Sequence, residues 1–392
     1  MSIPSYKTLA GQFYPIGSLL KDDGRICVLK TTEEEVIEYA NLLASNGFER
    51  WSYRLTPSSI DGKNNISYTY YNDKTCVVLF WESSYQTARI VYYPKKPLPP
   101  KFLSQTTGDK TPFLTQCKVE FGSSYVIGLS NGNFLLVDGG NSNKEDQENL
   151  YNYLKSYVEK NKKIVIEGWF FTHPDCDHIT LATNFINEYK LDVEIKAFIY
   201  QFPDLQKVQM LVDKGQVNQD ISALENAIKN NHPSATVYTS HTGQVYSFDG
   251  VDVEILYSLD DTYPMVYPSP NEMSLALKLT FRNGESAILL GDCMNQSCRQ
   301  IAFTYGSYLK SKIMQTAHHG LIGGDTYLYK AVDPKICLWD TQKERFYGKR
   351  ITDKYQWCIG EGGCDYNRYL RDESISKREH FINSKNNVFL MK

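Results

Sequence analysis

The sequence predicts an α/β (α+β) protein of two domains, on three observations. Its 392 residues exceed the roughly 150 residues of an average domain. A proline-rich segment from Pro94 to Lys101 is typical of a stiff linker. After this segment strand-like and helical patterns alternate, which indicates a layered α/β domain. We therefore predict a small α+β N-terminal domain at residues 1–105 and a larger α/β domain at residues 112–392.

The N-terminal domain is predicted to combine one helix with antiparallel strands. Thr32 and Glu35 have the spacing of a capping box, and apolar residues recur after them at helical spacing. Runs rich in β-branched and aromatic residues follow at 66–71, 76–82 and 88–93. Residues 1–105 contain no histidine. We therefore expect them to supply no metal ligand and to cover the mouth of a site or form a dimer contact.

Composition and charge exclude several classes of protein. Hydrophobic residues make up 42% and charged residues 22%, which is typical of a globular chain and not of a disordered one. The net charge of -3 does not favour a general nucleic-acid or membrane-surface binder. No apolar run approaches the roughly 20 residues of a membrane helix, and no signal-peptide pattern is visible. Nine cysteines without a C-x-x-C pair agree with a reducing compartment, so we expect a cytoplasmic protein.

The strongest chemical signal is the segment Thr-His-Pro-Asp-Cys-Asp-His, which directly follows a β-rich run. Its four candidate metal ligands are His173, Asp175, Asp177 and His178. Imidazole with carboxylate is a ligand set for Zn, Mn or Fe. A polar surface loop is the alternative, but chance rarely places two of only seven histidines with two aspartates at this spacing. We therefore predict a metal-binding loop.

Three further apolar runs end in a potential ligand. Phe134 to Val137 leads into Asp138, an Ile-Leu-Leu-Gly run leads into Asp292, and a strand-like run leads into His318 and His319. Each is weak evidence alone, because Asp-Gly and Gly-Asp pairs are common in turns. Together with the metal-binding loop they predict one site gathered at the ends of several strands.

In this order the segments resemble the metallo-β-lactamase superfamily across residues 112–392. Within it the chain is most similar to the ComEC-like branch, as a stand-alone protein. The similarity rests on His-Pro-Asp-Cys-Asp-His-Ile, Asn271-Glu-Met-Ser274, Leu-Gly-Asp and His-His-Gly. The resemblance implies an αββα metallo-β-lactamase sandwich with one or two divalent metal ions at its edge.

The resemblance also implies roles for individual residues. The implied metal ligands are His173 and Asp175 for a first ion, Asp177 and His178 for a second, Asp292 between them, and His318 or His319 to complete the second site. Asp138 would support the metal loop. Asn271 and Ser274 would lie near the site.

Two departures from the family pattern concern the first metal. Asp175 stands where the broad pattern has its second histidine. No histidine with a convincing ligand context lies between the metal loop and Asp292. His232, in a polar loop, is expected to be solvated, and His241 is expected to lie in a turn rather than on a metal.

Hydrolysis is the reaction that such a ligand set favours. A metal lowers the pKa of bound water and supplies hydroxide at neutral pH, while Asp177 and Asp292 hold the metal and orient the attacking water. We predict a metal-dependent hydrolase that uses a metal-bound hydroxide. Among its possible substrates, the phosphodiester type is favoured. The alternatives are a lactone, ester or amide hydrolase, a non-catalytic binding protein with a degenerate metal site, and a redox di-iron protein.

Cofactor and partner expectations follow from the same residues. The expected cofactor is one or two Zn²⁺ or Mn²⁺ ions, ahead of Fe. The expected partner is a small-molecule or nucleotide-type substrate, with no membrane. Nucleic acid stays an alternative that the net charge does not support, and a homo-oligomer stays open.

Overall fold

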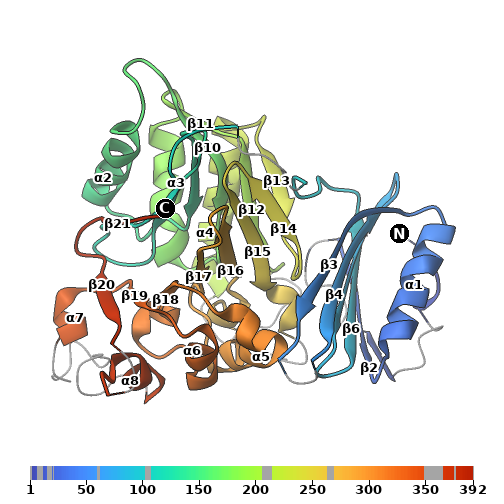
Figure 1. Ribbon diagram of the computed structural model, residues 1–392. Helices are drawn as coiled ribbons and strands as arrows, with labels where there is room; N and C mark the ends of the chain where they lie inside the picture. The colour runs from blue at the N-terminus through green and yellow to red at the C-terminus, as the bar shows by residue number, and fades with distance from the viewer. Residues whose placement is uncertain are drawn as a thin grey trace.

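The computed structural model describes residues 2–6, 12–15, 20, 22–59, 62–101, 107–204, 214–262, 269–347, 365–374 and 377–391. Three sheets organise these residues, and the smallest, with its helix, stands beside the other two (Figure 1). None of the described helices combines the length and the apolar composition that crossing a membrane requires.

The N-terminal sheet is antiparallel, with the strand order β1-β2-β6-β5-β4-β3. Its strands are β1 (Gln12–Pro15), β2 (Gly24–Leu29), β3 (Glu49–Pro57), β4 (Asn64–Tyr71), β5 (Thr75–Glu82) and β6 (Thr87–Pro94). Helix α1 (Glu33–Ser45) begins at the predicted capping box, in which the Thr32 side chain accepts from Glu35 N. Its buried face, which includes Val36 and Leu43, packs on the sheet. We call this sheet with α1 the N-terminal unit.

The two larger sheets each contain a run of parallel strands. The first has the order β13-β12-β10-β9-β8-β7-β21, with β11 beside β10. Its strands are β7 (Phe113–Gln116), β8 (Tyr125–Gly128), β9 (Phe134–Val137), β10 (Ile164–Phe170), β11 (Val193–Ile195), β12 (Ala197–Tyr200), β13 (Thr236–Thr239) and β21 (Asn387–Leu390). The second has the order β14 to β20: β14 (Val245–Phe248), β15 (Val251–Tyr257), β16 (Ala276–Phe281), β17 (Ser286–Leu289), β18 (Ile313–Gln315), β19 (Ile336–Trp339) and β20 (Glu379–Ile382).

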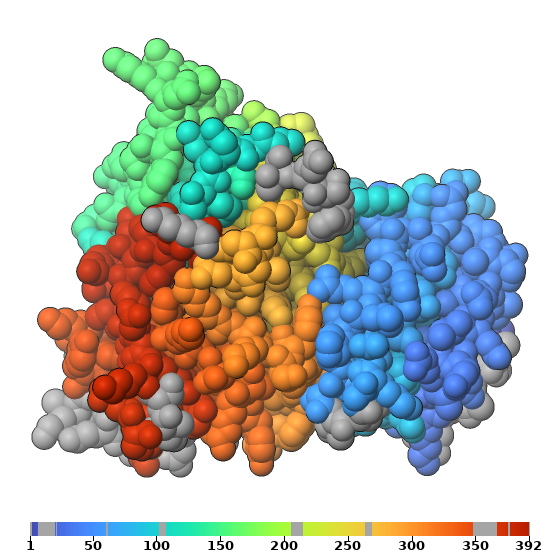
Figure 2. Space-filling model, viewed as in Figure 1, coloured from blue at the N-terminus to red at the C-terminus, as the bar shows by residue number. Residues whose placement is uncertain are grey.

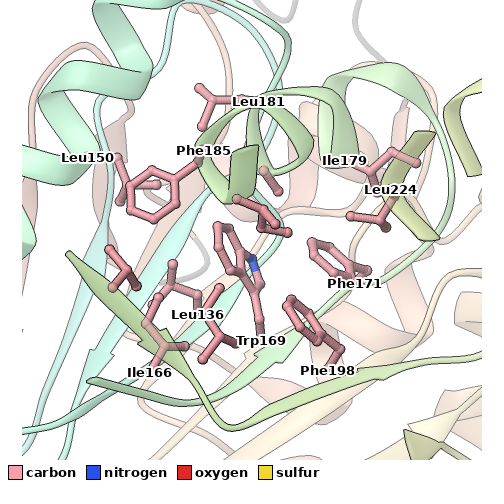
Figure 3. Packing of buried hydrophobic residues seen from close by; sticks show 14 of the residues in the cluster. Leu136, Leu150, Ile166, Trp169, Phe171, Ile179, Leu181, Phe185, Phe198 and Leu224 are labelled. Carbon is pink, nitrogen blue, oxygen red and sulfur yellow. The ribbon is translucent and has the colours of Figure 1, made fainter. Parts of the chain in front are cut away.

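Three apolar clusters hold these sheets and their helices in four layers. The helices are α2 (Lys144–Lys155), α3 (Cys176–Glu188), α4 (Lys214–Asn231), α5 (Asn295–Tyr305), α6 (Thr326–Val332), α7 (Lys343–Tyr347) and α8 (Asp365–Arg371). One cluster lies between α2, α3, α4 and the first sheet, where Trp169 packs among aromatic and aliphatic side chains (Figure 3). A second lies between the sheets, and a third between the second sheet and α5, α6 and α8. The predicted αββα sandwich is therefore confirmed.

Buried ion pairs join the N-terminal unit to the sandwich, and Figure 2 shows the blue N-terminal residues packed directly against it. Arg25 of β2 donates to Asp260 Oδ1 at 2.6 Å and also binds Asp23. Arg89 of β6 pairs with Asp261. Burial raises the pKa of Asp260, but the neighbouring His241 and Arg25 lower it by more, so its pKa lies below the usual range. The interface is thus strongly charged as well as closely packed.

We expect Arg25→Ala to destabilise the protein by about 3–5 kcal/mol, because it leaves two buried carboxylates with less compensating charge. Urea unfolding measures the loss. The control is Arg282→Ala, whose ion pair with Asp252 is partly exposed and whose loss should cost less than about 1 kcal/mol. Equal, small losses in both variants would contradict the expectation.

Candidate metal centre

The parallel strands bring the predicted ligands to one edge of the sandwich. Asp138 follows β9, and the metal loop follows β10 in the first sheet. Asp292 follows β17, and His318 and His319 follow β18 in the second sheet. The ends of strands in both sheets meet closely at Gly291, where a Cβ would lie 2.8 Å from the Thr172 side chain. The carboxyl ends of these strands therefore form the site.

Four side chains converge closely enough to hold one metal ion. Asp177, His178, Asp292 and His319 each offer one ligand atom, and these atoms lie within 4.8 Å of one another. His319 Nε2 lies 3.1 Å from Asp177 Oδ2 and 3.2 Å from Asp292 Oδ2. His178 Nε2 lies 3.2 Å from Asp292 Oδ1. This geometry favours His319 over His318 for the second site.

The remaining predicted ligands lie around Asp292 Oδ2, the oxygen that His319 also approaches. His173 Nε2 lies 3.6 Å from Asp175 Oδ2 and 3.9 Å from Asp292 Oδ2. His318 Nε2 lies 3.6 Å from the same Asp292 oxygen. Asp292 is therefore approached by both sets of predicted ligands, as the family resemblance implied for a shared ligand.

Unpartnered buried atoms show that this donor set fits a divalent cation. The Nε2 atoms of His173, His178 and His319 and the Oδ1 atom of Asp292 are buried and have no hydrogen-bond partner among the described residues. A buried polar atom without a partner is costly. Imidazole nitrogen and carboxylate oxygen are ligands for Zn²⁺, Mn²⁺ and Fe²⁺. A metal ion among the four clustered side chains would satisfy the atoms of His178, His319 and Asp292, and His173 Nε2 would need a second ion.

Hydrogen bonds on the outer side of two imidazoles aim their Nε2 atoms inward. His178 Nδ1 lies 2.8 Å from Asp138 Oδ2, and the Thr172 hydroxyl donates to the same oxygen at 2.7 Å. His319 Nδ1 lies 3.0 Å from the Asp340 carbonyl oxygen. An acceptor at Nδ1 fixes the tautomer in which Nε2 is free to bind a metal. Asp138 thus occupies the supporting position predicted for it.

Asp340 is a site residue that the sequence interpretation missed. Its buried carboxylate accepts hydrogen bonds from Tyr125, Ser123 and Gln116. Burial raises its pKa, despite these donors. The signal was available, since Ile-Cys-Leu-Trp-Asp is an apolar strand that ends in aspartate, as at Asp292.

The structure shows the surroundings of four further residues that the sequence analysis singled out. Ser274 Oγ accepts from Asp292 N at 3.1 Å, so it orients the central carboxylate. Asn271 Oδ1 is buried and unpartnered among the described residues. His241 lies outside the cluster and binds Asp260 through Nδ1 at 2.9 Å. The expectation that His232 is solvated is wrong, because the end of α4 buries all but 8% of it.

Three of the seven described non-glycine residues with positive φ lie at this site. Asp138, His318 and His319 have φ values of 53°, 51° and 56°, a left-handed conformation that non-glycine residues seldom adopt. Residues held in this way cluster at functional sites in many proteins. The strained turns place a carboxylate and two imidazoles where a relaxed backbone would not.

Without a metal, the charges of neighbouring side chains determine which groups of the site are protonated. Burial lowers the pKa of His319, but Asp292 and Asp177 raise it by more, to about 10. The pKa of His178 is also raised, because Asp292 and Asp138 outweigh its burial. Burial raises the pKa of Asp177, yet His178 and His319 lower it below its usual value. Protons on two imidazoles thus balance the carboxylates when no metal does.

Comparisons with known proteins find similarity in structure only. No protein-family model matches the sequence, and no curated protein matches it. The metallo-β-lactamase fold protein YhfI from Bacillus subtilis is 12% identical, with a TM-score of 0.40 over 71% of this chain and 99% of that one. The short form of human tRNase Z is 10% identical, with a TM-score of 0.37 over 71% of this chain and 99% of that one. Similarity at this level assigns neither a family nor an activity.

We expect Asp138→Asn to weaken metal binding about 10–100-fold, because it removes the charged acceptor of the His178 Nδ1–H group. Competition with a chelating indicator measures the affinity. Asp249→Asn is the matched control, since Asp249 is a buried carboxylate that binds Thr107 and Gly108 instead. Equal affinities of Asp138→Asn and the unaltered protein would contradict the role of Asp138.

Metal uptake at pH 7 should release about two protons, one each from His178 and His319, because a ligating imidazole must be neutral. A raised pKa means that the proton is bound at pH 7, so metal affinity should increase as the pH rises towards the His319 pKa of about 10. Calorimetry in two buffers of different ionisation enthalpy counts the protons. A count of zero would show that the imidazoles are already neutral.

Proposed function

We propose that this protein is a metal-dependent hydrolase whose favoured substrates are phosphodiesters. The observation that carries the proposal is the convergence of three buried, unpartnered imidazole nitrogens on the two oxygens of Asp292. Nothing else among the described residues explains why the fold would gather so many ligand atoms without hydrogen-bond partners at one point.

The ligand atoms divide between two positions. Asp177, His178 and His319 would hold one ion, and His173, Asp175 and His318 would hold the other, with Asp292 shared. Divalent ions bound there would activate water and accept the negative charge that develops on a substrate oxygen. His318 takes the place of the histidine that the sequence lacks between the metal loop and Asp292.

The protein's own side chains define the direction of approach. Asp175 is 29% exposed at its side chain and Asp177 12%, whereas Asp292 is 3% exposed. These exposures support an approach of the substrate over Asp175 and Asp177. Asp177 would orient the attacking water from this rim, and the more deeply buried Asp292 would help to hold both ions.

Charge arithmetic favours a diester over a monoester. Three carboxylates contribute -3 and two divalent ions contribute +4, which leaves +1 before a metal-bound hydroxide is counted and 0 with it. A phosphodiester carries one negative charge at neutral pH and is opposed less by this balance than a phosphomonoester, which carries close to two. Lactones, carboxylic esters and amides are uncharged and are the alternative that the same balance allows.

The test is a metal-by-metal activity screen with bis(4-nitrophenyl) phosphate, 4-nitrophenyl phosphate and a lactone. We expect the diester to be hydrolysed fastest and Mn²⁺ to support more activity than Zn²⁺, because the carboxylate-rich ligand set is hard. Elemental analysis establishes metal content separately. Metal binding without turnover of any substrate would overturn the enzymatic proposal in favour of a binding protein.

Asp175→His should move the metal preference towards Zn²⁺ and shift the acidic limb of the pH-rate profile to lower pH. The substitution replaces a carboxylate with a neutral ligand, so it strengthens the pull of the metal on the water proton. The control is Asp73→His at a fully exposed turn of the N-terminal unit. An unchanged metal ranking and an unchanged acidic limb would show that Asp175 does not bind metal.

A further inference from the structure

A cavity of about 740 Å³ lies between the N-terminal unit and α5. Strands β2, β5 and β6 form one wall, with the β5–β6 turn, and one face of α5 forms the other. Its volume is in the range of roughly 300–1,000 Å³ that small-molecule sites occupy. The cavity therefore has the size of a binding site, and half of its wall comes from outside the sandwich.

One residue of the cavity lining is close in sequence to the candidate metal centre. Its lining includes Asn295, which is three residues beyond Asp292, so their backbones lie no more than about 11 Å apart. Asn295 Nδ2 donates to Asp325 Oδ2 at 2.9 Å, and Asp325 follows the turn that carries His318 and His319. This backbone separation is within the length of one extended diester.

The lining offers flat apolar surfaces and neutral hydrogen-bonding groups. Tyr85, which is 50% exposed, and Phe303 supply aromatic rings. The side chains of Asn295, Gln296 and Gln300 supply carboxamides along one face of α5. Aromatic rings stack on flat rings, and carboxamides both donate and accept at a ring edge.

The charged groups of the lining are already paired with the protein. Arg89 pairs with Asp261, and Arg299 Nη2 lies 3.1 Å from Asp325 Oδ2. Glu82 accepts the Thr304 hydroxyl. Each described cation of the lining thus faces a carboxylate, although the Arg299 side chain is 46% exposed and Arg89 Nε has no hydrogen-bond partner among the described residues. A phosphate or carboxylate would have to compete with Asp261 and Asp325 for these cations, so an uncharged group is the better occupant.

We propose that this cavity binds the uncharged, ring-bearing group on the non-reacting side of a phosphodiester, so that the N-terminal unit sets the substrate range. The inference rests on the proposed function. It names the class of the second ester group: a neutral flat ring with a polar edge. A nucleobase and a simple aryl group share this chemistry, and the experiment separates them.

The experiment compares 4-nitrophenyl phosphodiesters that share one leaving group and differ in the second ester group: methyl, phenyl, thymidine-5′ or 2-carboxyethyl. With the full chain and its preferred metal, kcat/KM for the ring-bearing diesters should exceed that for the methyl diester about tenfold, since stacking on aromatic side chains supplies binding energy of that order. The 2-carboxyethyl diester should show no advantage. A thymidyl diester above the phenyl diester identifies a nucleobase, and the reverse identifies an aryl group.

Variants locate the effect. Tyr85→Ala should remove most of the advantage of the ring-bearing diesters and leave the methyl diester unchanged. Gln296→Lys, at an exposed position, adds an unbalanced cation and should raise kcat/KM for the 2-carboxyethyl diester alone. Tyr53→Ala is the matched control, because Tyr53 is 46% exposed on β3 of the same sheet and lies outside the cavity lining.

The two proposals fail separately. If all four diesters react at the same rate, or if Tyr53→Ala acts like Tyr85→Ala, the cavity proposal is overturned while the hydrolase stands. If no diester reacts, the proposed function is overturned, and calorimetry with thymidine and with phenol tests the cavity directly. Binding of either compound that Tyr85→Ala weakens would support a neutral ring site, and absence of binding by both would overturn it.

Discussion

The burial of the Asp292 carboxylate among four imidazoles is the interaction on which the site depends. Its Oδ1 faces His178, while its Oδ2 faces His173, His318 and His319, at distances of 3.2 to 3.9 Å. A buried carboxylate is unfavourable unless compensating charge surrounds it. The surrounding imidazoles hold the pKa of Asp292 well below its usual value, despite a burial that raises it. Metal ions can replace the protons that supply this charge, so folding and metal binding are linked.

The topology of the sandwich brings the side chains that compensate the Asp292 charge to one place. Parallel strands β9 and β10 in one sheet and β17, β18 and β19 in the other deliver their carboxyl ends to a shared edge. The apolar cluster between the sheets fixes their separation. Side chains that are far apart in sequence then meet without a long loop. The strained turns after β9 and β18 complete the arrangement.

The features that could be predicted from the sequence are those that depend on a short stretch of neighbouring residues. The capping box at Thr32 and the strand-end position of Asp292 are visible in a few residues, and both were placed correctly. Strand β3 was missed because it is an edge strand with mostly exposed residues and little apolar alternation. Asp340 was missed because its importance lies in a carbonyl oxygen that only the packing of β18 against β19 brings to His319. The domain boundary near Pro94 stays a prediction.

The charged interface between the N-terminal unit and the sandwich contributes less net stability than an apolar interface of similar size would. This difference indicates a role for the ion pairs other than stability. Burying Arg25 with Asp260 and Arg89 with Asp261 gains little net stability over hydrophobic residues of similar size. Such pairs tolerate few relative orientations, because a misaligned buried charge loses its partner. An apolar interface would have allowed sliding, which would change the width of the cavity beside α5. We expect the ion pairs to hold that wall at a fixed distance from Asp292, as a substrate that spans both requires.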